Sequence, residues 1–464
     1  MSPRCLAPWT SMSLDPRGEV RVCCQNQWLR LGNVAESSLI DIWRGPELSR
    51  LRRHLLVEDF RLGCDECRIP VERGVAESAY FHNFAHLVPT GGDDPPWPAQ
   101  LELALSNTCN LQCVMCNGEL SSAIRARREH RPPLTSPYGP SFLEDLDPFL
   151  RRITSVNFLG GEPFLARESL AVMDRLVELG VRPQVSVTTN ATIWNDRVAD
   201  LVAALGMEVA VSVDGISDGV LESIRVGIDP EAFRRNTVSM RDVASAGGGR
   251  LRLLFSLQVG NWSELSGVLH WGDELDVDVG LNRVDHPIRH SLVHGPLADL
   301  EDAVVAMEAD PVARTLGRNR AVWELQLSAL RSVLDERRSS TSNVSIRPGR
   351  GPVRGGRGPA FRARIDADPN QIVVAVGWTG EEPLGLDLGE LVGGSLWCLV
   401  DLLTSRLGRL LRSDVRQPDS TSGERHDFTF ESSDGVVEVA ARVTSQEDGS
   451  SIWVIELRQS DPPE

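Results

Sequence analysis

The cysteines of this chain are concentrated at one end, and that distribution constrains the fold more than any other feature. Eight of the nine cysteines lie within the first 116 residues, and only Cys398 lies beyond them. Cysteines that simply fill a hydrophobic core would scatter along the chain. Because the count is odd and no export signal is visible, metal binding or catalysis explains them better than disulfide bonds do.

The composition excludes several classes of function. The chain has 464 residues, 41% of them apolar, which suffices for about two to four domains with their own cores. No apolar run is long enough to span a membrane, and no secretory signal is visible, so we expect a cytoplasmic protein. The net charge of −17 disfavours a nucleic-acid partner. Every basic residue is Arg, which excludes a Schiff-base lysine and a P-loop lysine.

The sharpest motif is the loop Cys109-x3-Cys113-x2-Cys116. Three thiolates at this short spacing suit an iron–sulfur cube in which each cysteine holds one iron. The fourth iron then lacks a protein ligand and is open to a small molecule. The alternative is three of the four ligands of a zinc site, with the fourth elsewhere in the chain.

This loop resembles that of the radical S-adenosylmethionine (SAM) enzymes. In that family the loop follows the first strand of a partial (β/α)6 barrel, and residues 101–106 read as such a strand here. The resemblance implies that Cys109, Cys113 and Cys116 hold a [4Fe–4S] cluster and that SAM binds its open iron.

The resemblance also assigns SAM contacts to residues at the ends of later strands. The motifs are a Gly-Gly-Glu-Pro turn, a Thr-Asn strand end, and a Ser-x-Asp strand followed by an Arg. A carboxylate in the turn is expected to meet the SAM ammonium, and its glycines to let backbone approach a ligand. Ala191 departs from the family, which often has Gly there. The assigned residues are Met115, Gly160, Gly161, Glu162, Pro163, Thr189, Asn190, Ser212, Asp214 and Arg225.

The N-terminal cysteines form a second group. Cys5 and Cys23 flank a predicted hairpin, and Cys64-x2-Cys67 follows. A zinc ribbon is one interpretation of four such thiols. The pattern, with a Gly-Asn-Val and a Ser-Leu-x-x-Ile-Trp segment between its halves, also resembles the twitch form of the SPASM domain. That resemblance implies an auxiliary [4Fe–4S] cluster, here placed before the barrel rather than after it.

One cysteine beside these ligands is spare. Cys24 follows Cys23 directly, and adjacent cysteines rarely both bind one iron. A small buried residue is the simpler interpretation of Cys24, and a catalytic thiol that gives hydrogen to the substrate is the alternative. A basic run after the cysteine loop, which includes Arg125 and Arg131, favours a solvated helix face over an anion clamp.

We therefore predict an α/β fold: a twitch-type iron–sulfur module, then a radical SAM partial barrel, then an α+β accessory domain. The predicted boundaries are 1–97 for the module, 98–290 for the barrel, 291–336 for a helical extension, 337–360 for an Arg/Gly/Pro linker and 361–464 for the accessory domain. The last segment carries 19 acidic and 9 basic residues and weakly resembles a PAS domain.

The predicted function follows from the resemblance. Such an enzyme cleaves SAM reductively to a 5′-deoxyadenosyl radical, with electrons from a donor such as flavodoxin or ferredoxin. A second cluster favours net oxidation of a C–H bond, by dehydrogenation or crosslinking, in a peptide or small natural product. The alternatives are a redox-neutral epimerase and a metal-stabilised binding or sensor protein without catalysis.

Overall fold

The computed structural model describes residues 5–26, 29–72, 76, 79–89, 94–285 and 287–342, together with five strands between residues 361 and 460. The chain divides into two compact units. The first comprises residues 1–256, 267–281 and 317–319, and contains both cysteine groups. In the described part of the chain, no helix is both long and apolar enough to cross a membrane.

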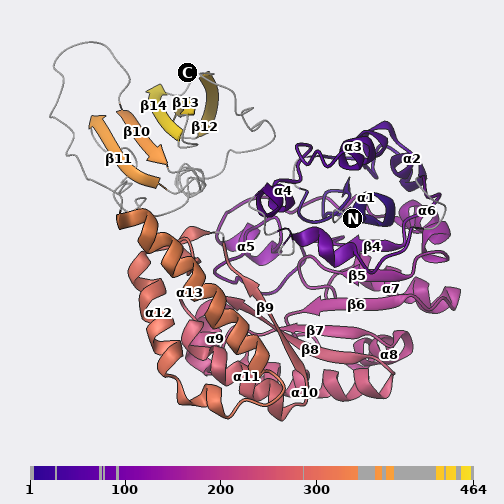
Figure 1. The fold of residues 1–464 in the computed structure, drawn as a ribbon. Coiled ribbons are helices and arrows are strands. Elements are labelled where there is room, and N and C mark those ends of the chain that lie inside the picture. Colours follow the sequence, from indigo (N-terminus) through magenta and orange to yellow (C-terminus); the bar gives the residue numbers. More distant parts are fainter. Residues whose placement is uncertain are drawn as a thin grey trace. The chain divides into compact units, whose positions relative to one another are not determined.

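One nine-stranded sheet organises the first unit (Figure 1). Strands β4 to β8 pair in parallel, as the barrel prediction requires. Its order is β3 (Gly32–Asn33), β2 (Glu19–Arg21), β1 (Ser11–Leu14), β4 (Gln100–Leu103), β5 (Ser155–Phe158), β6 (Gln184–Thr189), β7 (Glu208–Ser212), β8 (Arg250–Leu257) and β9 (Asp278–Arg283).

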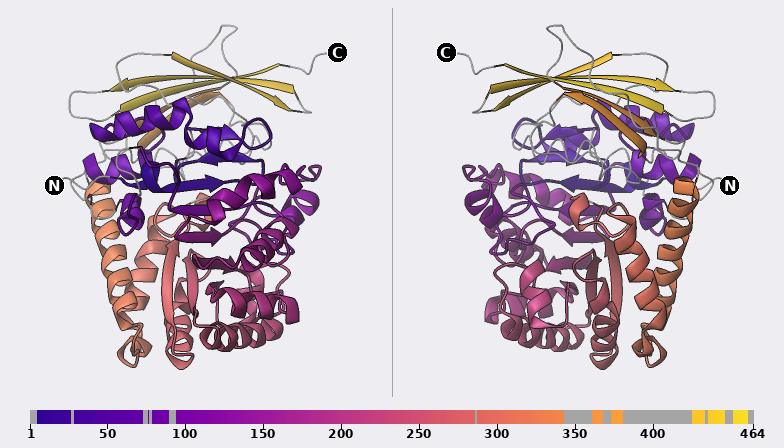
Figure 2. Two further views of the ribbon diagram at one scale, coloured as in Figure 1. Left: turned by 90° about the vertical axis from the view of Figure 1, so that its right-hand side faces the viewer. Right: turned by 90° about the vertical axis from the view of Figure 1, so that its left-hand side faces the viewer.

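Helices connect the parallel strands and form a layer beside them (Figures 1 and 2). The connecting helices are α5 (Ser122–Arg127), α6 (Pro140–Leu150), α7 (Arg167–Leu179), α8 (Asp196–Leu205), α9 (Asp218–Ile224), α10 (Pro230–Ala246) and α11 (Leu265–Glu274). Two of them, α7 and α8, each end at a glycine with left-handed backbone, Gly180 and Gly206.

The two faces of the sheet differ in polarity. Leu101 and Leu103 on β4 are fully buried, as are Val156 and Phe158 on β5. Alternate residues point to the other face, and there Glu102 lies in register with Asn157, whose Oδ1 accepts a hydrogen bond from Ser186 of β6. Helices need an apolar partner, so the polar face is the inner face of the partial barrel.

The N-terminal module continues this sheet. The predicted hairpin is confirmed: β1 and β2 pair antiparallel around a turn at Gly18, where φ is +82°. Strand β1 also pairs in parallel with β4, from Ser11 opposite Gln100 to Leu14 opposite Leu103. The module's helices are α1 (Ala7–Thr10), α2 (Leu39–Trp43), α3 (Pro46–Leu56), α4 (Asp65–Glu72) and the 3₁₀ helix η2 (Tyr80–Phe84).

The second unit contains residues 257–266, 282–316 and 320–464. Helix α12 (Leu297–Ala309) packs against α13 (Arg320–Ser342), and α13 continues into the first residues of the predicted linker. A separate antiparallel sheet has the order β11 (Val373–Gly380), β10 (Phe361–Ala367), β14 (Ser451–Ser460), β13 (Gly435–Ser445) and β12 (Arg425–Ser432). The domain boundaries and the PAS-like character stay predictions, and Cys398 lies outside the described residues.

Candidate active site

The three cysteines of the motif lie together beyond the end of β4. Burial raises the pKa of the Cys109, Cys113 and Cys116 thiols, that of Cys116 to about 12, and the charge of neighbouring thiols adds to the shifts of Cys109 and Cys116. The Cys109 N–H donates to Ser122 Oγ at 3.1 Å, which anchors the loop on α5. Thiols that raise one another's pKa become good ligands once a shared cation favours the thiolate form.

The donor set is three cysteine thiols on one short loop, which are the usual ligands of an iron–sulfur cluster. Within the described residues, no group of three or more His, Cys, Asp or Glu side chains converges closely enough to hold one metal ion. Ligands of a cubane cluster are expected to lie farther apart, because each cysteine holds a different iron. The arrangement of Cys109, Cys113 and Cys116 is therefore compatible with a [4Fe–4S] cluster.

The Gly-Gly-Glu-Pro turn is joined to the start of the cysteine loop. Gly161 N–H donates to Ser106 O at 3.0 Å, and Glu162 N–H donates to Thr108 O at 2.8 Å. A Cβ on Gly161 would lie 2.4 Å from Thr108 O, and Gly160 has a φ of +104°. The sequence suggested that these glycines let backbone approach a ligand. The structure shows that they let the turn approach the chain's own loop.

Glu162 lies at the centre of this region and is fully buried. Its carboxylate accepts hydrogen bonds from Thr189 Oγ1 at 2.8 Å, Asn190 N at 2.7 Å and Phe164 N at 3.2 Å. Burial nevertheless raises its pKa to about 7. The partners seen here are the protein's own donors, so the contact with the SAM ammonium stays a prediction.

The Thr-Asn strand end completes the connection to the loop. The side-chain amide of Asn190 donates to Asn110 Oδ1 at 3.2 Å and lies 3.8 Å from Cys109 Sγ. Ala191 follows with a φ of +55° and is fully buried. Left-handed backbone is where glycine is favoured, which agrees with the Gly that the family resemblance leads one to expect at this position.

A buried ion pair lies beside the cysteine loop. Arg225 Nη2 is 2.7 Å from Asp214 Oδ2, and both side chains are almost fully enclosed. Asp214 also accepts a hydrogen bond from Ser256 N at 2.9 Å. Arg225 acts electrostatically on Cys113, and its Nε is buried without a hydrogen-bond partner among the described residues. An enclosed N–H of this kind fits an anionic group such as a bound carboxylate.

The remaining assigned residues take less specific positions. Ser212 is half-buried at the end of β7, and Met115 is half-buried between Cys113 and Cys116. Pro163 is buried behind Glu162. Their proximity to SAM stays a prediction.

The N-terminal cysteines also come together. Cys5, Cys23, Cys64 and Cys67 line one pocket, whose walls include Tyr80, Phe81 and Phe84. Burial, followed by the charges of Cys24 and Cys5, raises the pKa of Cys23 well above its usual value. Asn26 donates from Nδ2 to Cys64 Sγ at 3.3 Å. Four thiols around one pocket fit a cluster with a protein ligand for every iron.

Cys24 lies outside that set of four and contacts two residues that the sequence did not single out. Its Sγ is 3.1 Å from Tyr80 Oη, and burial raises the pKa of Cys24 to about 11. The backbone of Cys24 and the side chain of Ser13 donate to the Glu102 carboxylate, whose pKa burial raises. Among the described residues, Glu102 Oε2 is buried without a hydrogen-bond partner. The sequence signal that could have identified Glu102 is that it is an acidic residue in the otherwise apolar stretch 101–105.

Two family models match the chain. The Radical SAM superfamily matches residues 103–245, and the iron–sulfur cluster-binding domain SPASM matches residues 5–68. These domains bind SAM, a [4Fe–4S] cluster and an auxiliary iron–sulfur cluster.

Curated relatives share part of the chain. A probable GTP 3′,8-cyclase of Sulfurisphaera tokodaii is 27% identical over 179 residues, which cover 38% of this chain and 53% of that protein. A GTP 3′,8-cyclase of Streptomyces coelicolor is 32% identical over 125 residues, which cover 27% of this chain and 35% of that protein. The chain thus spans about half, or less, of the length of these relatives.

Solved structures show a partial likeness. The structure titled "Native anSMEcpe with bound AdoMet" has a TM-score of 0.35 and 20% identity, and covers 44% of this chain and 58% of its own. The structure of Streptococcus suis SuiB bound to precursor peptide SuiA has a TM-score of 0.35 and 15% identity. The match covers 59% of this chain and 61% of the SuiB chain.

The order of the landmarks agrees with the two matched domains. The cysteine loop follows β4 and the later motifs follow β5, β6 and β7, as expected at the carboxyl ends of barrel strands. The chain therefore contains a radical SAM domain, and it carries a SPASM-type iron–sulfur domain ahead of it.

Proposed function

We propose that this protein is a radical SAM enzyme that oxidises a C–H bond of a peptide or small natural product. The bound cofactors supply a 5′-deoxyadenosyl radical and a second electron-transfer centre. The observation that carries the proposal is the parallel pairing of β1 with β4, which makes the auxiliary module and the first barrel strand neighbours in one sheet. A nearby second centre suits a reaction that removes an electron as well as a hydrogen atom.

In this proposal the chain's residues have distinct roles. Cys109, Cys113 and Cys116 would hold the SAM cluster, and Cys5, Cys23, Cys64 and Cys67 the auxiliary cluster. Arg225, held by Asp214 at 2.7 Å, would receive the SAM carboxylate. Glu162 and Asn190 fix the start of the cysteine loop. The remaining SAM contacts would be those that the sequence resemblance assigned.

Glu102 is suited to take up the proton that a net oxidation releases. It lies on the inner face of β4 and is buried, and one of its oxygens has no hydrogen-bond partner within the described part of the chain. Burial raises its pKa, which favours the protonated product of such a transfer. Tyr80 lines the auxiliary pocket and contacts the Cys24 thiol, and the Cys24 backbone donates to Glu102.

The substrate and the electron donor are further parts of the proposal. A flavodoxin or ferredoxin would supply the electron for SAM cleavage. A redox-neutral epimerisation is the alternative, in which Cys24 would return a hydrogen atom to the substrate radical. Deuterium from solvent would then appear in the product, whereas a dehydrogenated or crosslinked product loses hydrogen.

The first test is SAM cleavage by anaerobically reconstituted protein. With SAM and dithionite we expect 5′-deoxyadenosine, together with iron and acid-labile sulfide sufficient for two clusters. Cys113→Ala should abolish 5′-deoxyadenosine while leaving the iron of the auxiliary site. Cys398→Ala is the matched control and should behave like the unchanged protein. Bound zinc without sulfide would contradict the proposal and favour a metal-stabilised binding protein.

The curated relatives make GTP a second test compound. The proposal expects GTP to be recovered unchanged after incubation with SAM and dithionite. Conversion of GTP to a cyclised product would instead favour the activity that the relatives' names state.

A further inference from the structure

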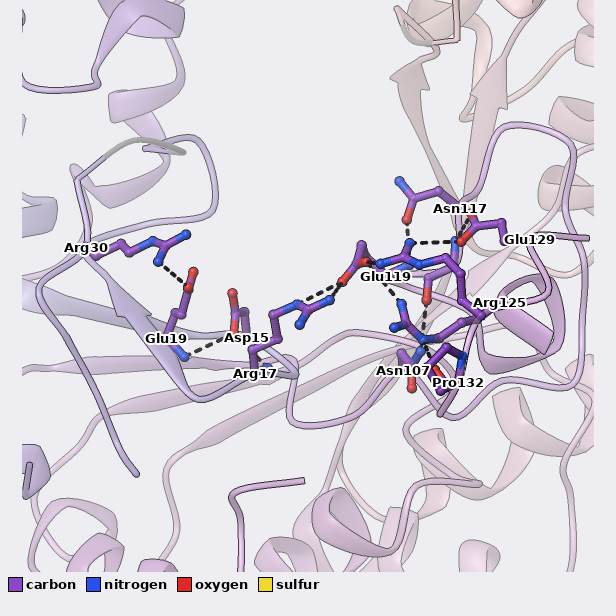
Figure 3. A network of polar contacts seen from close by, with 12 residues as sticks. Asp15, Arg17, Glu19, Arg30, Asn107, Asn117, Glu119, Arg125, Glu129 and Pro132 are labelled. Carbon is purple, nitrogen blue, oxygen red and sulfur yellow. Dashed lines mark hydrogen bonds and ion pairs between the residues drawn. The ribbon is translucent and has the colours of Figure 1, made fainter. Parts of the chain in front are cut away.

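The exit of the cysteine loop is held by a carboxylate that three arginines share (Figure 3). Glu119 Oε2 accepts hydrogen bonds from Arg17 Nε at 2.9 Å and Arg17 Nη2 at 2.6 Å. Its Oε1 accepts from Arg131 Nη2 at 2.6 Å and Arg125 Nη1 at 3.1 Å. Burial would raise the pKa of Glu119, but the hydrogen bonds from Arg17 and Arg131 lower it. Glu119 is therefore a charged acceptor, and such hydrogen bonds are among the strongest.

The backbone between Cys113 and Glu119 is fixed by further contacts. Gly118 N–H donates to Glu129 Oε1 at 2.7 Å, and a Cβ on Gly118 would lie 2.1 Å from Glu129 Oε2. The Arg128 guanidinium donates to the carbonyl oxygens of Gln112 and Cys113 at 3.3 Å each. This frame of charged side chains therefore helps to hold the loop exit, together with Asn107, whose Nδ2 donates to Gly118 O at 2.9 Å.

Arg17 reaches this frame from the N-terminal module. It lies in the β1–β2 turn, where its N–H donates to Asp15 Oδ1 at 2.8 Å and its carbonyl accepts from Asn33 Nδ2 at 3.1 Å. Cys23 of the auxiliary pocket lies just past the other end of β2. The hairpin therefore carries a pocket cysteine at one end and the Glu119 contact at the other.

The strand pairing alone does not hold the loop exit. The β1–β4 ladder ends at Leu103, before the cysteines, and the Glu162 contact with Thr108 holds only the loop entry. Arg17 is the residue of the hairpin that reaches the exit, where Glu119 follows Cys116 in the chain.

We propose that Arg17 and Glu119 are positioning residues that couple the auxiliary-cluster module to the SAM-cluster loop, so that filling the auxiliary pocket strengthens SAM binding. Coupling between two sites is reciprocal, so SAM should also favour assembly of the auxiliary cluster. The inference needs the family's cofactors but no substrate and no particular reaction.

The test measures SAM affinity rather than turnover. In otherwise unchanged protein, loss of the auxiliary cluster through Cys64→Ser with Cys67→Ser should weaken SAM binding by about fivefold or more, within the usual range of coupling between sites. In Arg17→Gln protein, loss of the auxiliary cluster should change SAM binding by less than about twofold, because the Arg17–Glu119 ion pair that connects the two sites is gone. Iron and sulfide counts verify which clusters each protein holds.

The matched control is Arg30→Gln. Arg30 lies in the same module and pairs with Glu19 at 2.8 Å, away from Glu119 (Figure 3). In Arg30→Gln protein, loss of the auxiliary cluster should still weaken SAM binding by about fivefold. An equal effect in Arg17→Gln, or none in the unchanged protein, would overturn the proposal.

A second readout covers the case in which the double serine variant does not fold. In the protein with both clusters, Arg17→Gln should speed hydrogen exchange at the Gly118 and Glu119 amides, and Arg30→Gln should not. Unchanged exchange at both amides in Arg17→Gln would equally overturn the coupling.

Discussion

At the scale of single residues, the main finding is that the motif carboxylate serves the fold. Glu162 joins three segments that are distant in sequence: its own turn, the end of β6, and, through Thr108, the cysteine loop. A sequence motif shows that a glutamate stands at this position, but it does not show which groups the glutamate contacts. Its partners depend on the register of β5 against β6, which is a property of the folded sheet.

The raised pKa of Glu162 predicts how stability changes with pH. The folded state keeps the proton up to about pH 7, whereas the unfolded chain releases it near the ordinary value of 4.5. Unfolding therefore releases a proton in this window, and the free energy of unfolding of cluster-free protein should fall as pH rises from 4.5 to 7. The size is about 3 kcal/mol for a shift of this order.

The measurement is urea unfolding at pH 5 and pH 8. Glu162→Gln should flatten the pH dependence, whatever its effect on stability at one pH. Glu222→Gln, a change at an exposed residue of α9, is the control and should keep the slope. An unchanged slope in Glu162→Gln would assign the pH dependence to another group.

At the scale of elements, the β1–β2 hairpin is where the two cysteine groups are tied together. Its turn needs the left-handed backbone of Gly18, and a Cβ there would lie within 2.9 Å of Pro137 Cγ, Asn33 Oδ1 and Val34 Cγ2. The hairpin was predictable because its pattern is local: alternating apolar residues around Pro and Gly. Its pairing with β4 was not, because about 85 residues separate the two strands.

Gly18→Ala should destabilise the hairpin by about 1–3 kcal/mol, from backbone strain and contact with three neighbours. We expect less iron per chain at the auxiliary site and earlier proteolysis of the N-terminal segment. Gly139→Ala is the matched control, since its φ is −100° and a Cβ there meets nothing within 4 Å. Equal iron content in both variants would show that the turn tolerates a side chain.

At the scale of the whole molecule, the auxiliary module is part of the barrel sheet rather than an appendage. Three of the nine strands come from it, and β4 lies between β1 and β5. Without β1, strand β4 would become an edge with unpaired backbone groups beside two buried leucines, Leu101 and Leu103.

Deletion of residues 1–97 should therefore give a barrel that aggregates, and not a smaller soluble enzyme. The measurement is the soluble fraction after expression, followed by light scattering. The control is deletion of residues 343–464, which removes no strand of the nine-stranded sheet and should leave SAM binding in place. A soluble, monomeric protein beginning at residue 98 would show that β4 needs no partner.

The sequence by itself determined the two cysteine groups and the order of most strands and helices, because these follow from spacing and periodicity within short segments. The cofactors followed from the resemblance of its motifs to the radical SAM and SPASM domains. Tertiary structure alone decided the β1–β4 pairing, the partners of Glu162, the Cys24–Tyr80–Glu102 contacts and the Arg17–Glu119 bridge. Each of these joins residues brought together only by strand register and packing. A local pattern carries no record of such contacts, because the residues that form them are far apart in the chain.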